Sequence, residues 1–165
     1  TTGISSSSAI LADGEAVLAA ILAATTKMDE DEVPQEDRHL FITPTKLNSV
    51  KALDTTKSRE ALEGFASINK VPQSRFYSAI ELLPGNTTET KAGGFKKATG
   101  ALNINFMIIH KPATLQFTKH VSNKIIRPED NQDADAWKFG YRAYGLTDVY
   151  ENKVAGIFAH FDPGA

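Results

Sequence analysis

Residues 137–145 read Trp-Lys-Phe-Gly-Tyr-Arg-Ala-Tyr-Gly, and residues 154–160 read Val-Ala-Gly-Ile-Phe-Ala-His. In the first segment aromatic side chains alternate with polar or small ones, a period of two that is typical of a half-buried strand. The second segment is apolar and follows a short turn. The two segments are therefore predicted to pair as an antiparallel hairpin, with Trp137 in the core and Arg142 on the opposite face.

The residues before this segment predict helices first and strands later. Asp13 is placed to cap a helix over residues 13–28, and Thr43 with Pro44 begins a helix that ends near residue 53. A polar loop is expected at residues 54–60. Strands are expected at residues 40–42, 102–108 and 113–121, and strands or extended segments at residues 66–71 and 74–83. Early helices and late strands without regular alternation indicate an α+β fold with mostly antiparallel sheets.

Composition narrows the class of protein. The chain has 165 residues, of which 41% are hydrophobic and 23% are charged, and this excludes a disordered chain or a coiled coil. The absence of cysteine excludes disulfides, a thiolate nucleophile and cysteine-based zinc sites. The net charge of −2 matches nucleic acid poorly, and no apolar run reaches the roughly 18 residues of a membrane span. Because the chain starts at Thr1 without methionine, we expect it to be a piece of a longer protein.

The sequence contains no complete motif for catalysis or ligand binding. Residues 93–100 are rich in glycine but lack the lysine that a phosphate-binding loop needs after its second glycine. Residues 131–142 begin like a calcium loop but place Ala136 and Arg142 where glycine and glutamate are required. The four histidines form no His-x-x-x-His pair. We therefore expect no enzyme activity, no catalytic residue, no cofactor and no metal.

Several segments, taken in order, resemble the major capsid proteins of tailed bacteriophages with the Hong Kong 97-type fold. The matched segments are residues 29–44, 71–77, 104–113, 126–137 and the closing segments at 137–160. The segment at residues 29–44 begins with an acidic helix end, continues through Val-Pro and an arginine, and leads to a strand that ends in proline. The likeness extends from about residue 16 to residue 160. It implies the C-terminal portion of a subunit, without the N-terminal arm, extended loop and spine helix of that family.

The resemblance also implies a division of the chain into three parts. Residues 1–12 are expected to be a loose N-terminal segment. Residues 13–110 are expected to form a mostly axial-domain-like α+β region, in which residues 84–100 are a mobile loop. Residues 111–165 are expected to be returning β-strands of the peripheral-domain type.

A protein of this family is a structural subunit of an icosahedral bacteriophage or prophage capsid, which self-assembles into the head shell that encloses DNA. The implied partners are other copies of the subunit, in hexamers and pentamers when full length, and non-specific packaged DNA on the inner face, with no membrane. The implied location is the virion, and the host bacterial cytoplasm before assembly. The fragment itself is expected to form no closed shell. Candidate subunit-interface residues are Arg38, Arg75, Arg142 and Tyr144, because arginine and tyrosine are enriched at interface hot spots.

Two alternatives remain at this stage. An encapsulin-like bacterial compartment shell protein shares the fold, and a cargo-peptide groove on the inner face would identify it. The other alternative is an α+β ligand-binding domain or enzyme. A deep pocket holding His110 or His120 beside a perturbed carboxylate would favour that second alternative.

Overall fold

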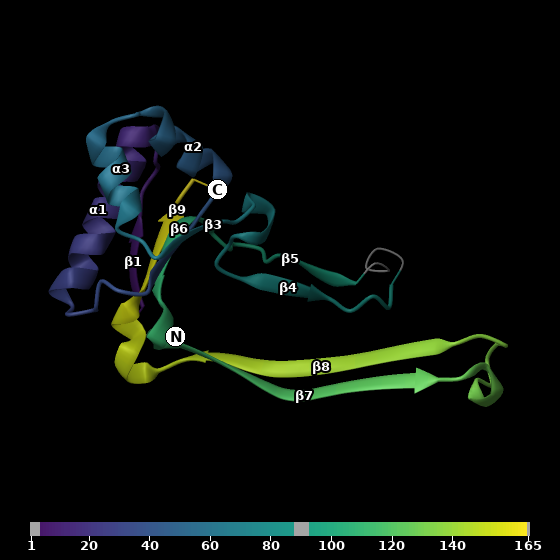
Figure 1. Ribbon diagram of the computed structural model, residues 1–165. Helices are drawn as coiled ribbons and strands as arrows, with labels where there is room; N and C mark the ends of the chain where they lie inside the picture. Colours follow the sequence, from purple (N-terminus) through teal and green to yellow (C-terminus); the bar gives the residue numbers. More distant parts are fainter. Residues whose placement is uncertain (1–3, 88–92, 165) are drawn as a thin grey trace. The chain divides into compact units, whose positions relative to one another are not determined.

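The computed structural model describes residues 4–87 and 93–164 of the chain (Figure 1). Its contacts divide the chain into two compact units, Thr1–Ala113 with Glu151–Ala165, and Thr114–Tyr150. The helices of the first unit are α1 (Gly14–Glu30), α2 (Pro44–Ala52) and α3 (Thr56–Glu63). Its strands are β1 (Ser5–Ser8), β2 (Arg38–Ile42), β3 (Ser67–Lys70), β4 (Ile80–Leu83), β5 (Gly94–Lys97), β6 (Asn103–His110) and β9 (Ile157–Asp162).

Short 3-10 turns join several of these elements. In the first unit they are η1 (Gln73–Arg75), η2 (Lys111–Ala113) and η4 (Glu151–Gly156). The second unit consists of strand β7 (Thr114–Ile126), the turn η3 (Pro128–Asp130) and strand β8 (Lys138–Val149). No helix of the described residues is both long and apolar enough to cross a membrane.

A five-stranded mixed sheet forms the centre of the first unit. Its strand order is β1-β9-β6-β2-β3, in which β6 pairs antiparallel with both β2 and β9. The two edge strands, β1 and β3, run parallel to their neighbours β9 and β2. Strands β4 and β5 form a separate antiparallel pair in the same unit. The predicted α+β class therefore agrees with the observed architecture.

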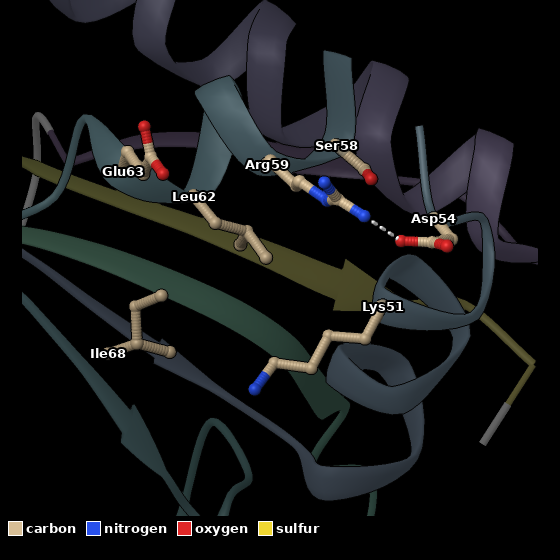
Figure 2. A pocket seen from close by; sticks show the side chains of 7 residues that line it. All are labelled: Lys51, Asp54, Ser58, Arg59, Leu62, Glu63 and Ile68. Atoms are coloured by element: carbon tan, nitrogen blue, oxygen red, sulfur yellow. Dashed lines mark hydrogen bonds and ion pairs between the residues drawn. The ribbon is translucent and has the colours of Figure 1, made fainter. Parts of the chain in front are cut away.

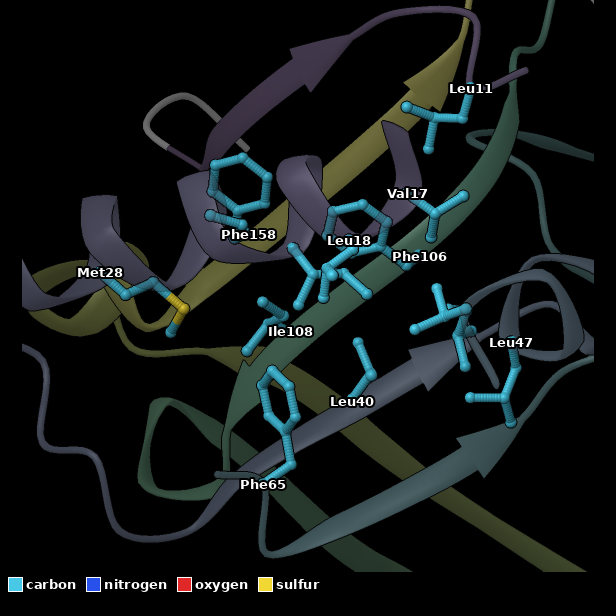
Figure 3. Close-up of a cluster of buried hydrophobic side chains, with 14 residues drawn as sticks. Leu11, Val17, Leu18, Met28, Leu40, Leu47, Phe65, Phe106, Ile108 and Phe158 are labelled. Atoms are coloured by element: carbon cyan, nitrogen blue, oxygen red, sulfur yellow. The ribbon is translucent and has the colours of Figure 1, made fainter. Parts of the chain in front are cut away.

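The helices pack on one face of this sheet, around a buried apolar cluster (Figure 3). Helix α1 contributes Val17, Ile21 and Met28, spaced so that they share one stripe of the helix. The sheet contributes alternate residues that point to the same face, among them Phe106 and Ile108 of β6. Each such side chain stabilises the fold by about 1.5–3 kcal/mol when it is fully buried.

Both predicted early helices are present, with the starts that the sequence indicates. The Asp13 carboxylate accepts a hydrogen bond of 2.8 Å from the Ala16 N–H and so caps α1. Helix α2 follows Thr43 and has Pro44 in its first turn, although the Thr43 side chain makes no capping hydrogen bond. The predicted strands at 40–42, 66–71, 102–108 and 113–121 are also found, with shifted ends. Residues 74–83 were predicted as a strand or an extended segment; in the structure this stretch begins in the turn η1 and ends as β4.

The prediction that residues 154–160 pair with residues 137–144 is wrong. Strand β8 pairs instead with β7, whereas β9 lies between β6 and β1 in the five-stranded sheet. The segment after the closing turn begins as the 3-10 turn η4 before it becomes β9. A period of two identifies a strand but does not identify its partner. The segment at 154–160 was predicted as the partner because it follows residues 137–144 closely in the sequence.

Three smaller segments also differ from expectation. Helix α3 occupies much of the predicted loop at 54–60, because Thr55 and Ser58 form a reciprocal capping box at its start. Ser5–Ser8, expected to be loose, forms β1, which pairs through its backbone with β9 and so shows no apolar alternation. Within residues 84–100, the described part includes β5 paired with β4, and residues 88–92 lie outside the described ranges.

Candidate interaction surface

The unit Thr114–Tyr150 is a long two-stranded ribbon of β7 and β8. Its register is regular except at one β-bulge, where Thr118 pairs with Gly145 and His120 pairs with Tyr144. The extra residue, Lys119, therefore has no counterpart on β8. Because side chains alternate between faces, the bulge exchanges the faces of the residues that follow it on β7.

The bulge gathers apolar side chains on one face of the outer part of the ribbon. The sequence alternation would place Phe117 and Val121 together, but their partners Leu146 and Ala143 lie on opposite faces of β8. We call the face that carries Val121 and Ala143 the apolar face. It is formed by Val121, Ile125, Phe139, Tyr141 and Ala143.

Most of the apolar face is open to solvent. Phe139 and Tyr141 are each 74% exposed, and Trp137, which stacks on Phe139 with ring centroids 6.5 Å apart, is 56% exposed. The expectation that Trp137 belongs to the core is therefore wrong. Contiguous exposed aromatic and aliphatic side chains of this kind mark interaction sites. The alternation in the sequence was correct, but it does not say what covers the apolar face.

The opposite face carries positive charge, and we call it the basic face. It is formed by Lys138, Lys124, Arg142 and His120, which occupy four successive cross-strand pairs. Tyr144, an interface candidate, shares this face, and its ring lies tilted against that of His120 with centroids 5.6 Å apart. Arg142, another candidate, is exposed there and lies on the opposite face from Phe139, as predicted. A shallow depression of about 410 Å³ opens around Lys124, Gly140 and Arg142.

Arg38 contacts groups of its own chain. It is 3% exposed, and its guanidinium donates hydrogen bonds to the carbonyl oxygens of Val33 and Pro34. The same group lies 2.7 Å from the Asp29 carboxylate. These contacts join the end of α1 to the start of β2. The structure thus gives Arg38 a role in folding, and we do not retain it as an interface residue.

The remaining candidate, Arg75, is exposed in η1 of the first unit. The register puts Arg142 and Tyr144 on the same face of the ribbon, whereas Arg75 belongs to the other unit. The bulge at Lys119 was missed by sequence reasoning. Its one sequence signal is Gly145 inside a strand, where an added Cβ would lie 2.5 Å from the Phe117 carbonyl oxygen.

Two pockets of the first unit bear on the enzyme alternative. His110 lines a pocket of about 490 Å³ together with acidic residues of the α1–β2 connection. Burial lowers the pKa of His110, and the charge of Arg38 adds to the effect. The pocket has no serine or threonine among its lining residues. In the described part of the chain, no group of three or more His, Asp or Glu side chains is arranged to hold a metal ion.

The second pocket, of about 430 Å³, lies among α2, α3 and β3 (Figure 2). Lys51, Leu62 and Ile68 line it, and an ion pair between Arg59 and Asp54 stands beside it. Its hydroxyl group, on Ser58, donates to the Thr55 carbonyl oxygen in the capping box. That hydroxyl therefore stabilises the start of a helix.

Comparison with known proteins finds similar solved structures but no sequence match. A structure of mycobacterium phage Che8 has a TM-score of 0.56 and 11% identity, with 95% of this chain and 53% of that chain covered. The capsid structure of cyanophage P-SCSP1u has a TM-score of 0.61 and 14% identity, with 98% and 54% covered. No family model and no curated protein matches.

This chain spans about half the length of the solved chains that it matches. At such low identity the likeness shows the fold alone, and it covers nearly all of this chain. The resemblance noted in the sequence is therefore confirmed at the level of structure. The chain is an α+β protein with the fold of these two bacteriophage structures, of which the cyanophage structure is a capsid.

Proposed function

We propose that this protein is a structural subunit of an icosahedral bacteriophage or prophage capsid with the Hong Kong 97-type fold, and not an enzyme. Copies of the subunit would assemble as hexamers and pentamers into the head shell that encloses DNA. The protein would then reside in the virion, and in the host bacterial cytoplasm before assembly. The observation that carries this proposal is the fold likeness to phage structures over 95–98% of the chain.

The β7–β8 ribbon supports assembly with other copies. A two-stranded ribbon is marginally stable by itself in water, and further strands or a packed face are needed to stabilise it. Here the apolar face is exposed, and within the described residues each strand has a hydrogen-bonded partner on one side only. A neighbouring subunit can cover the apolar face, and repetition by symmetry multiplies each weak contact.

We further propose how the two units correspond to parts of such a subunit. The first unit, with its five-stranded sheet and helices, would be the axial-type region. The ribbon would be the returning strands of the peripheral-type region. Under this assignment β9 belongs with the axial-type region, because it pairs with β6.

Expression of the complete open reading frame that encodes this chain tests the proposal. We expect closed particles of uniform diameter in negative-stain microscopy and light scattering. Tyr141→Asp on the apolar face should abolish the particles while leaving far-UV circular dichroism and the thermal midpoint unchanged. Thr147→Asp is the matched control: Thr147 is exposed on the same side of β8, six residues beyond Tyr141 and past the apolar side chains, and this variant should still assemble.

A monodisperse small species under all assembly conditions would contradict the shell function. Particles that form equally well with Tyr141→Asp would leave the shell function standing but would exclude the apolar face from the contact.

A further inference from the structure

The basic face has a regular arrangement along the ribbon. Each of four successive cross-strand pairs contributes one basic side chain, and these come alternately from β8 and β7. In order from the turn they are Lys138, Lys124, Arg142 and His120. Successive pairs on one face are two residues apart, or about 6.8 Å along the strand. The result is a linear array of basic groups about 20 Å long.

The centre of this array is open and not neutralised. Lys138 pairs with Asp133 at the turn end. Among the residues that the structure describes, neither Lys124 nor Arg142 takes part in an ion pair. The carboxylate of Asp148 shares the face but stands two pairs beyond His120.

The partner of Lys124 on β8 is Gly140, which has no side chain to cover the lysine. An added Cβ there would lie 3.6 Å from the Lys124 Cβ. The depression of about 410 Å³ therefore opens between Lys124 and Arg142, the two cations of the array without an ion pair among the described residues, and Ser122 also lines it.

We propose that the basic face binds the phosphate backbone of DNA without regard to sequence. A linear array of cations is complementary to a linear polyanion, whose phosphates it neutralises with release of counterions. Arg142 can donate two parallel hydrogen bonds to one phosphate, and Lys124 acts as a point charge. The inference rests on the proposed function, in which the polyanion is DNA. To that function it adds the residues that contact the DNA.

The charges around the array limit its affinity. The turn residues Glu129, Asp130 and Asp135 add negative charge beyond Lys138 and would repel DNA there. The contact is thus confined to the stretch from Lys124 to His120, and the affinity of the isolated chain is in the range of non-specific binding, about 10⁻⁴–10⁻⁶ M. In a shell, the same weak contact repeats in every subunit.

Fluorescence anisotropy of a labelled 30-base-pair duplex, titrated with the 165-residue chain, tests the proposal. The double variant Lys124→Gln/Arg142→Gln should bind at least about tenfold more weakly at low salt. Its salt slope should fall by about 1.8, because each phosphate contact on B-DNA contributes ~0.9. The control Lys57→Gln/Lys70→Gln removes the same charge from exposed positions of the other unit, and its affinity should change less than about threefold. Circular dichroism checks that both variants fold.

Several results would overturn the inference. One is the absence of binding by the wild-type chain at low salt, and another is an equal loss of affinity in both double variants. A third is competition by polyglutamate as effective as that by unlabelled duplex, which would assign the basic face to carboxylates such as those of a neighbouring turn.

The test is independent of shell formation. Particles that assemble from a chain that does not bind DNA would leave the proposed function intact and refute only this inference. Conversely, DNA binding that depends on Lys124 and Arg142, in a protein that never forms particles, would refute the shell and keep the site.

Discussion

The Nδ1 atom of His160 lies 3.2 Å from the amide nitrogen of Asn105, in the buried interior of the five-stranded sheet. The histidine is 2% exposed, and its ring stacks on Phe106 with centroids 5.1 Å apart. Because the amide nitrogen donates, Nδ1 must accept, and the neutral ring then carries its proton on Nε2. A second proton would place two donors face to face.

Stability should fall in mild acid because of this histidine. Burial holds the pKa of His160 below its ordinary value of 6.5, and the opposing charge of Asp162 does not reverse the effect. The unfolded chain then takes up the proton at a higher pH than the folded chain does. The stability linked to this group is complete above the unfolded pKa and is lost as the pH falls toward the folded pKa.

Urea unfolding between about pH 7.5 and pH 5 measures the effect. We expect the unfolding free energy of the wild type to decrease over this range, and that of His160→Gln to decrease less. His110, whose pKa burial also lowers, leaves a residual dependence. The exposed His120→Gln is the matched control and should retain the wild-type slope. Equal slopes for wild type and His160→Gln would show that another group is responsible.

Two aromatic truncations should separate the core from the ribbon. Phe106 is fully buried in the apolar cluster, so Phe106→Ala should cost about 3–5 kcal/mol of unfolding free energy. Trp137 is more than half exposed, so Trp137→Ala should cost less than about 1 kcal/mol in this chain. Chemical denaturation of both variants decides the matter. A cost for Trp137→Ala near that of Phe106→Ala would mean that the indole is covered in solution.

The contrast between these two aromatic residues shows what sequence patterns can predict here. Alternation correctly indicated strands around both Phe106 and Trp137, and the caps at Asp13 and Pro44 correctly located two helices. The pattern records which side chains share a face. It does not record whether another layer of this chain covers that face, because that depends on tertiary arrangement.

The strand partners and the bulge also could not be predicted from the sequence. β9 joins β6 across about 50 residues of chain, and no local signal favours this pairing over the adjacent β8. At Lys119 one extra residue reverses the faces of β7, so the apolar and basic faces could not be assigned from alternation. Arg142 and Tyr144 were identified by residue type, but Lys124 became part of the same face only through the register.

Arg38 should be needed for folding. Its truncation leaves the carbonyl oxygens of Val33 and Pro34 without their donor and removes the partner of Asp29. Loss of a buried charged donor with several partners should cost about 2–4 kcal/mol in Arg38→Ala. Arg75→Ala, at an exposed position, should change the unfolding free energy by less than about 0.5 kcal/mol. Denaturation midpoints that are equal for the two variants would contradict the folding role described for Arg38.

Gly145 should be required for the bulge, and through it for the separation of the two faces. A Cβ at this position would lie 2.5 Å from the Phe117 carbonyl oxygen, a backbone atom that cannot move without opening the strand pair. Gly145→Ala should therefore destabilise the ribbon by about 1–3 kcal/mol. Gly140→Ala meets nothing closer than 3.6 Å and should be neutral or slightly stabilising, because alanine loses less backbone entropy than glycine.

Hydrogen exchange of the β7 and β8 amides is the suitable measurement, because the ribbon can open without unfolding the first unit. In Gly145→Ala these amides should exchange about fivefold or more faster, since 1.4 kcal/mol corresponds to a factor of ten, while those of β6 keep their protection. If the β7 and β8 amides are equally protected in Gly145→Ala and Gly140→Ala, the strands do not approach closely at Thr118. The bulge would then not fix which side chains face each other, and both the apolar face and the basic face would need a different register.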